Sequence, residues 1–137
     1  MKFKSLHGRE KKVSNIKKYL IDWDSPSRSK FQFAVKIFLK KYWINHVVFE
    51  EFPLVGSKMS FDFYNSNRKV AVEVQGGQHT KYTPFFHGFN KINYISQLSR
   101  DKQKLDFCNI NDITLVEIYP NDQITPNLFA KFGVKLI

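Results

Sequence analysis

Apolar positions recur at helical spacing in two stretches of the chain. The segment SPSRS supplies a helix cap, and the residues after it predict a helix with a core face and a basic face. Its apolar positions are Phe31, Ala34, Val35, Phe38 and Tyr42, and the lysines that fall largely elsewhere are Lys30, Lys36, Lys40 and Lys41. A second amphipathic helix is predicted over residues 92–108, with apolar positions Ile92, Ile95, Leu98, Leu105 and Cys108.

Four other stretches show the alternation and the β-branched or aromatic residues that are typical of strands. They cover residues 46–52, 60–64, 70–75 and 113–118. Short turns between the first three favour an antiparallel meander. The helix-length connection before the fourth favours a parallel pairing with the third, reached by a right-handed crossover. We therefore expect an α/β domain with the element order αβββαβ and a mixed four-stranded sheet flanked by helices.

Two carboxylates lie among the apolar residues of the second and third predicted strands. The apolar residues expected to line a common core are Phe61, Phe63, Val70, Val72 and Val74. Pairing Phe63 with Val72 meets that condition, because a slip of one residue would move every side chain to the other face. Asp62 then lies opposite Glu73, with Cβ atoms roughly 5 Å apart.

Neighbouring carboxylates repel unless a positive charge lies between them. Mg²⁺ or Mn²⁺ would satisfy this pair, since hard divalent cations take oxygen ligands. Asp62, Glu73, the backbone carbonyl of Val74 and waters would supply them, leaving positions for a phosphate oxygen and an attacking water. The alternative is an ordinary solvated face with Lys or Arg neighbours.

The chain is basic, with a net charge of +10 over 137 residues. Residues 1–46 hold 12 Lys and Arg against three acidic residues, whereas residues 47–137 hold 10 against nine. We therefore expect a basic N-terminal extension over residues 1–28, with a short helix over residues 11–21, before a main domain over residues 29–137. The extension is either a DNA-binding surface or a solvated arm. The residues expected to hold DNA are Lys11, Lys12, Lys17, Lys18, Arg28, Lys30, Gly76, Gly77 and Lys81.

Cysteine content and hydropathy bear on the compartment. Cys108 is the single cysteine, so no disulfide framework exists, and we expect a small buried residue in a reducing compartment. No stretch approaches the ~18 apolar residues of a membrane helix, and no apolar run follows the charged N-terminus. We expect a cytoplasmic protein, in a bacterial or phage-infected cell, that does not bind membranes.

Asp62, then turn and strand, then Glu73-Val74-Gln75 resembles the motif of the PD-(D/E)XK nuclease superfamily. FDFY followed by VEVQGGQH is similar to the small branch of very-short-patch repair and phage homing endonucleases, as is RDKQKLDFCNINDITLVEIY from Arg100. The resemblance covers roughly residues 29–137. It implies a restriction-endonuclease-like αβββαβ core and a metal-dependent nuclease.

The sequence departs from that pattern at two positions. Gln75 stands where the family most often has lysine, and Lys104 or Lys102 is expected to replace the missing charge. Gln32 stands where the branch often has a helix glutamate. A third acidic ligand would then be absent, or would come from Glu50 or Glu51.

Other polar residues follow the predicted strands. His79 comes after a Gly-Gly turn, where it would act as a general base or leaving-group acid, or else cap the loop or contact the DNA backbone. Gly76 and Gly77 would allow positive φ and close approach to DNA. Asp101 and Lys104 lie one helical turn apart and would either face the site or form a solvated ion pair.

These features predict a DNA endonuclease or nickase that hydrolyses phosphodiesters by metal-activated water. Asp62 and Glu73 would hold Mg²⁺ or Mn²⁺, while Gln75 positions the water and His79 and Lys104 assist proton transfer and charge neutralisation. The protein would be a homodimer if it cuts both strands and a monomer if it nicks. The alternatives are a weak or inactive nucleic-acid-binding module with the same fold, suggested by Gln32 and Gln75, and an RNA nuclease.

Overall fold

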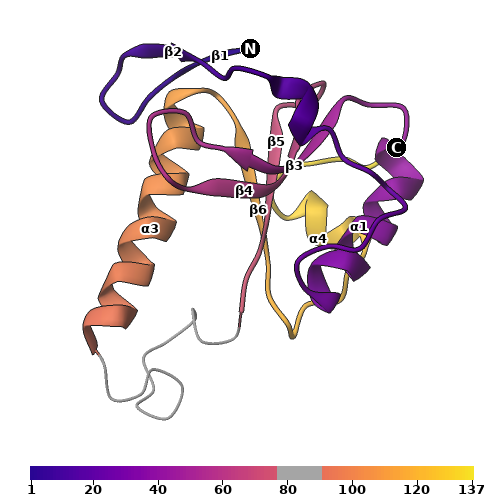
Figure 1. The fold of residues 1–137 in the computed structure, drawn as a ribbon. Coiled ribbons are helices and arrows are strands. Elements are labelled where there is room, and N and C mark those ends of the chain that lie inside the picture. The colour runs from indigo at the N-terminus through magenta and orange to yellow at the C-terminus, as the bar shows by residue number, and fades with distance from the viewer. Residues whose placement is uncertain (77–90) are drawn as a thin grey trace.

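The computed structural model describes residues 1–76 and 91–137 of the chain (Figure 1). Strands and helices follow one another closely along this part of the sequence. The strands are β1 (Lys2–Lys4), β2 (Glu10–Lys12), β3 (Val48–Pro53), β4 (Ser60–Asn65), β5 (Val70–Val74) and β6 (Thr114–Ile118). The helices are the 3₁₀ turn η1 (Ile16–Tyr19), α1 (Lys30–Trp43), α3 (Lys91–Ile110) and α4 (Pro126–Ala130).

The main sheet has four strands in the order β3-β4-β5-β6. The first two pairings are antiparallel and the β5–β6 pairing is parallel. The predicted α/β class, element order and mixed sheet are therefore confirmed. The β4–β5 register pairs Phe63 with Val72, as the apolar pattern predicted.

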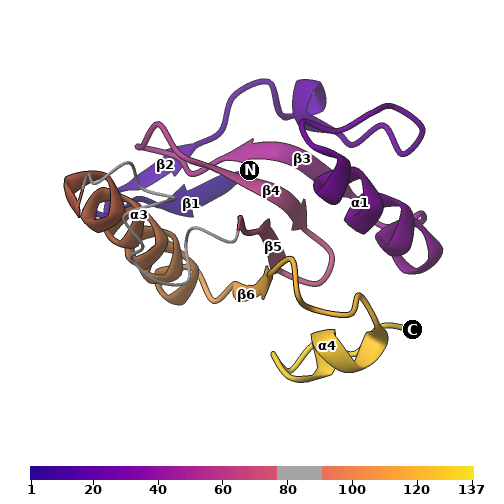
Figure 2. The same cartoon turned by 90° about the horizontal axis from the view of Figure 1, so that it is seen from below.

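Two apolar clusters cover the two faces of the sheet. One lies between the sheet and the pair α1 and α4, and its core includes Val35, Leu39, Trp43, Phe63, Val72, Val116, Ile118 and Phe129. The other lies under α3 and the β1–β2 hairpin, and its core includes Phe3, Val13, Phe49, Phe52, Phe61, Tyr64, Phe107 and Cys108. Figure 2 shows α1 and α4 on one side of the strands and α3 with the hairpin on the other. The expectation that Cys108 is a small buried residue is confirmed.

The expectation that Phe61 and Phe63 line a common core is wrong. Phe63 belongs to the α1-side cluster with Val72, whereas Phe61 packs with Tyr64 in the cluster under α3. Phe61 and Tyr64 are three positions apart, so they can share a face only if β4 departs from strict alternation. The departure falls at Asp62, between the two phenylalanines.

Helix α1 begins as predicted, and Val35, Phe31, Phe38 and Tyr42 of its predicted apolar face pack in the α1-side cluster. The hydroxyl of Ser29 caps it by accepting the N–H of Gln32. Its buried positions are Gln32, Val35, Lys36, Leu39 and Trp43. Ala34 is exposed, and Lys36, expected on the basic face, is fully buried. The buried ammonium of Lys36 pairs with the carboxylate of Glu50, at 2.7 Å.

Between residues 11 and 21 the N-terminal segment is helical only over the four residues of η1, so the predicted helix is wrong over most of its length. Residues 2–4 and 10–12 instead pair as the β1–β2 hairpin, and Asn15, in the left-handed conformation at φ 56°, leads into η1. Phe3 and Val13 anchor the segment in the core under α3. The side chain of Asn111, just beyond α3, also accepts the N–H of Lys4 and donates to its carbonyl, at 2.8 and 2.9 Å.

A short C-terminal helix was not predicted. Thr125 caps α4 by accepting the N–H of Leu128, and Pro126 occupies its first turn. Leu128 and Phe129 bury against the α1-side cluster. Within residues 1–76 and 91–137, no helix is long and apolar enough to cross a membrane.

Candidate active site

A cavity of about 350 Å³ opens between the ends of β4 and β5 and the facing side of α3. It is lined by Arg28, Lys58, Met59, Ser60, Asp62, Glu73, Val74, Gln75, Gln97, Arg100, Asp101 and Lys104. Most of these side chains are polar or charged. The cavity therefore suits a charged or strongly hydrated ligand better than an apolar one.

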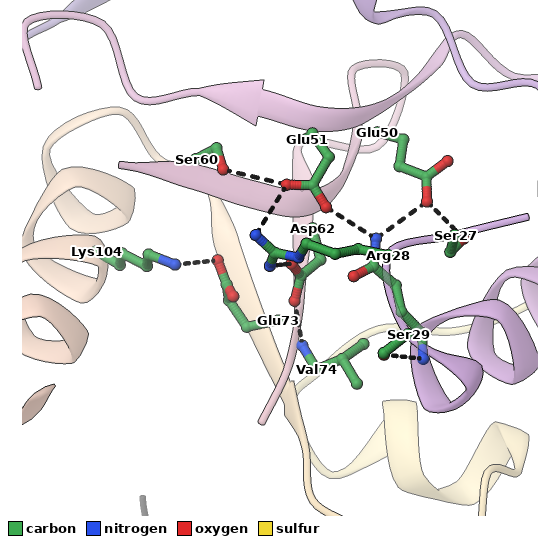
Figure 3. A network of polar contacts seen from close by, with 11 residues as sticks. Ser27, Arg28, Ser29, Glu50, Glu51, Ser60, Asp62, Glu73, Val74 and Lys104 are labelled. Atoms are coloured by element: carbon green, nitrogen blue, oxygen red, sulfur yellow. Dashed lines mark hydrogen bonds and ion pairs between the residues drawn. The ribbon is translucent and has the colours of Figure 1, made fainter. Parts of the chain in front are cut away.

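Asp62 and Glu73 form the acidic floor of this cavity. They are 3% and 5% exposed, so little solvent reaches either carboxylate. Asp62 Oδ2 accepts the backbone N–H of Val74 at 2.7 Å, which fixes the Asp62 side chain against β5 (Figure 3). The predicted approach of the two carboxylates is confirmed, because both line the same cavity and each affects the pKa of the other.

The environment raises the pKa of both acids. For Asp62, burial raises the pKa, against the lowering effect of the Val74 N–H and of Glu73. For Glu73, burial and the charge of Asp62 raise the pKa to about 8, although Lys104 acts in the opposite direction. Burial is the largest cause of both shifts, so the poor solvation of the cavity floor disfavours the ionised form of each acid.

Two basic side chains contact the acidic floor. Lys104 Nζ lies 2.8 Å from Glu73 Oε1, and its side chain is 18% exposed. Lys104 is therefore the lysine that α3 brings to the site. Lys102, the other candidate, points elsewhere and pairs with Asp106 at 2.9 Å on the exposed side of the helix. Arg28 reaches in from the loop before α1 and contacts Asp62 Oδ1 at 3.3 Å.

An irregularity in β3 brings two further carboxylates toward the same region. Glu50 pairs with Phe63 and Phe52 pairs with Phe61, but Glu51 and Asp62 between them do not pair. Glu51 has φ 53°, a value that side-chain-bearing residues rarely adopt. As a result Glu50 and Glu51 both face the loop before α1 and the start of that helix, where strict alternation would separate them.

Gln32 holds those two carboxylates rather than facing the cavity. Its Nε2 donates to Glu50 Oε2 at 3.0 Å and to Glu51 Oε1 at 3.1 Å. Glu50 also accepts the Ser27 hydroxyl at 2.6 Å and pairs with buried Lys36. Glu51 reaches Arg28 at 3.7 Å. Thus Glu51, through Arg28, adjoins Asp62, whereas Glu50 belongs to the attachment of α1 (Figure 3).

Gln75 is fixed by a residue that the sequence reasoning missed. Gln75 is 5% exposed, and its Nε2 donates to Glu117 Oε2 at 3.2 Å, which also accepts the Tyr119 hydroxyl at 3.1 Å. Glu117 pairs in register with Glu73 across the parallel β5–β6 ladder. Glu117 could have been found from the sequence, because the predicted parallel pairing of these strands allows Glu117 and Glu73 to lie side by side on one face of the sheet.

The remaining predicted residues divide by location. Asp101 lines the cavity, and so do Lys58 and Arg100, which were not predicted. Lys11, Lys12, Lys17, Lys18 and Lys30 are exposed outside its lining, on the hairpin, on η1 and at the start of α1. Gly76 follows β5. Gly77, His79 and Lys81 lie outside the described residues.

The donor set can be compared with what a divalent cation requires. Among the described residues, no three His, Cys, Asp or Glu side chains gather as a metal-binding group. Mg²⁺ does not need three, since it commonly keeps several waters and uses one or two carboxylates with substrate phosphates. The oxygen-only pair of Asp62 and Glu73, buried and lining one cavity, fits that mode.

Comparisons with known proteins give viral relatives. The chain is 40% identical to uncharacterized protein 307L of Invertebrate iridescent virus 6 over 74 residues, which are 53% of this chain and 37% of the relative. It is 33% identical to uncharacterized protein 033L of Invertebrate iridescent virus 3 over 82 residues, 58% of this chain and 42% of the relative. The matched region thus covers less than half of the length of each of these two relatives.

A third relative matches over most of its length. It is uncharacterized protein 094L of Frog virus 3, which is 31% identical over 120 residues, covering 82% of this chain and 76% of the relative. No family model matches the chain, and no solved structure matches it.

Proposed function

The chain belongs to the family of uncharacterized protein 094L of Frog virus 3, and for this member we propose a divalent-metal-dependent DNA endonuclease or nickase. We propose that its fold is the restriction-endonuclease-like core of the PD-(D/E)XK nucleases. The observation that carries the proposal is the pair of buried carboxylates on adjacent strands, Asp62 and Glu73, with Lys104 against one of them. Buried acids with raised pKa values that line a polar cavity are typical of functional sites.

The site residues have separate roles in this proposal. Asp62, Glu73 and the backbone carbonyl of Val74 would hold Mg²⁺ or Mn²⁺, which would polarise the phosphate and lower the pKa of a bound water. Lys104 places a positive charge beside the scissile phosphate. Gln75, with one amide hydrogen held by Glu117, keeps its side-chain oxygen available to orient a water molecule.

The cavity lining supports a phosphodiester substrate. Arg28, Lys58, Arg100 and Lys104 all contribute to it, so cationic groups surround the acidic floor. A phosphate group would complement this arrangement, since Arg and Lys donors recognise phosphate oxygens. The basic N-terminal residues would extend binding along the polymer. The viral relatives point to an infected cell as the setting.

A second candidate is a nucleic-acid-binding module with no catalytic activity. Arg28 already contacts Asp62, and Lys104 already contacts Glu73. In addition, Gln32 and Gln75 stand where a glutamate and a lysine were expected. In that case the acids would only stabilise the loop before α1 and the end of α3. An RNA nuclease would use the same residues and differs in substrate alone.

The test is cleavage of supercoiled plasmid and of a matched RNA with Mg²⁺, Mn²⁺ or EDTA. We expect metal-dependent nicking or linearisation of DNA. Asp62→Ala and Glu73→Ala should each lower the rate by about a thousandfold or more, because a metal ion contributes several kcal/mol of transition-state stabilisation. Asp106→Ala is the matched control, since Asp106 is an acid of α3 outside the cavity lining.

The outcomes separate the candidates. Linear product from the wild-type protein, together with dimers in solution, would support the homodimer form, whereas nicked product from a monomer would support the nickase. Metal-independent DNA binding without cleavage would support the inactive module. Near-full activity of Asp62→Ala would exclude the proposed site.

A further inference from the structure

Arg28 lies between the carboxylates of two strands. Its guanidinium is 3.3 Å from Asp62 Oδ1 and 3.7 Å from Glu51 Oε2, so one cation bridges an acid of β4 and an acid of β3 (Figure 3). The Arg28 side chain is nevertheless 70% exposed. It therefore neutralises the acids from the solvent side and has room to leave without disturbing the core.

The backbone on either side of Arg28 is held in place. The Ser27 hydroxyl donates to Glu50, and the Ser29 hydroxyl caps α1. Two residues further back, the Ser25 carbonyl accepts from buried Lys36 at 3.0 Å. Any movement of the guanidinium is thus a rotation of the side chain about a fixed point at the mouth of the cavity.

A cation that binds Asp62 would lie next to the Arg28 guanidinium. The other oxygen, Asp62 Oδ2, already accepts the Val74 N–H at 2.7 Å. Oδ1 is the oxygen with greater freedom to bind a cation, and it is the one that Arg28 contacts. Two cations that contact one oxygen repel each other.

We propose that Arg28 alternates between two anionic partners: it occupies Asp62 and Glu51 in the metal-free protein, and it binds a phosphate of the nucleic acid once a divalent cation takes its place. The fixed backbone keeps the displaced guanidinium at the rim, beside Lys58 and Arg100 of the same lining. A guanidinium suits both partners because it pairs with carboxylate and phosphate oxygens alike. The inference rests on the proposed function.

Calorimetric titration of Mn²⁺ tests the first half of this exchange. Arg28→Ala should bind Mn²⁺ about tenfold more tightly than the wild-type protein, because a charge-assisted hydrogen bond of ~1.5 kcal/mol no longer competes. Arg68→Ala, an exposed arginine in the turn between β4 and β5, should bind as the wild type does. Asp62→Ala should lose most of the Mn²⁺ affinity.

Fluorescence anisotropy with a DNA duplex tests the second half. With Ca²⁺ present, Arg28→Ala should bind DNA about tenfold more weakly than the wild type, since a phosphate contact is lost. With EDTA the two proteins should bind within about twofold of each other, because Arg28 is then held by Asp62 and Glu51. Arg68→Ala again serves as the control.

The results distinguish this inference from the proposed function. If Mn²⁺ binds in an Asp62-dependent way but Arg28→Ala leaves its affinity unchanged or weaker, the exchange is overturned and the metal site stands. Equal loss of DNA affinity with Ca²⁺ and with EDTA would also overturn it. If neither the wild type nor Arg28→Ala binds Mn²⁺, the exchange and the proposed metal-dependent nuclease fail together.

Discussion

Burial and the neighbouring charge of Asp62 raise the pKa of Glu73 from its ordinary value of 4.5 to about 8. The metal-free protein therefore holds a proton on Glu73 at neutral pH, and this proton is lost when a cation binds. A group with a raised pKa in the folded state favours folding fully below its unfolded pKa, and that contribution disappears as the pH rises through the folded pKa. The relevant window runs from about pH 4.5 to about pH 8.

The stability of the metal-free protein should therefore fall across this window. In urea unfolding with EDTA at intervals from about pH 5 to about pH 8, the wild type should lose on the order of a few kcal/mol. Glu73→Gln should show a much flatter profile, because its amide does not titrate. A wild-type curve that rises or stays level over the same range would contradict the raised pKa of Glu73.

At the scale of elements, α1 is attached to the sheet by a buried ion pair. Lys36 is fully buried on the helix, and its ammonium lies 2.7 Å from Glu50 on β3. Ser27 and Gln32 complete the hydrogen bonding of that carboxylate. A buried pair contributes little net stability when it replaces apolar packing, but leaving one partner alone is costly.

Lys36→Ala should destabilise the protein by about 3–5 kcal/mol, since Glu50 would remain charged without its cation. The double variant Lys36→Met, Glu50→Gln should recover most of this loss. Lys40→Ala is the control on the same helix, because its pair with exposed Asp24 is worth about 0–1 kcal/mol. Chemical denaturation measures all three, and a small effect of Lys36→Ala would show that the pair is not needed to attach α1.

The sequence predicted correctly the elements that depend mainly on their own residues. The strands of the main sheet, the pairing of Phe63 with Val72 and the parallel β5–β6 ladder all followed from alternation and connection length. The proximity of Asp62 and Glu73 was predicted for the same reason. The sequence predicted a lysine from the second helix at the site but left Lys102 and Lys104 as alternatives. Which of them faces the sheet depends on how the helix packs, and the structure shows that it is Lys104.

The features that were missed depend on residues far apart in sequence. Lys36 was expected to be exposed, but it is buried and its ammonium pairs with Glu50 on β3. The N-terminal hairpin was not predicted, because it depends on the packing of Phe3 against Phe52, Tyr64 and Phe107. Arg28 was assigned to the DNA-binding surface, although it also contacts Asp62, because nothing in its neighbours indicated that a break in β3 would bring Glu51 there.

At the scale of the whole molecule, the most basic part of the chain also contributes to the core. Phe3 and Val13 are buried under α3, while Lys11, Lys12, Lys17 and Lys18 between and after them are exposed. Removing residues 1–24 would therefore lower stability as well as charge, since losing one buried Phe alone costs about 3–5 kcal/mol. The charge is better tested by substitution.

Replacing Lys11, Lys12, Lys17 and Lys18 by Gln should leave the melting temperature within a few degrees of the wild type. If these lysines bind DNA phosphates, the slope of log K against log salt should flatten by up to about 3.6, at about 0.9 for each phosphate contact. The control replaces the exposed lysines Lys41, Lys69, Lys131 and Lys135 by Gln. Equal slopes for the two variants would identify the N-terminal lysines as a solvated surface.

The two hydrogen bonds between the Asn111 side chain and the backbone of Lys4 join residues that are 107 positions apart. During synthesis, the hairpin leaves the ribosome long before that asparagine has been added, and before Phe107 is available to cover Phe3. Contacts across so large a separation close late, because the loop entropy must be overcome first. The hairpin is made well before α3, yet it can pack only when Phe107 and Asn111 have been made, so in the nascent protein its apolar side chains remain accessible to chaperones and to neighbouring chains.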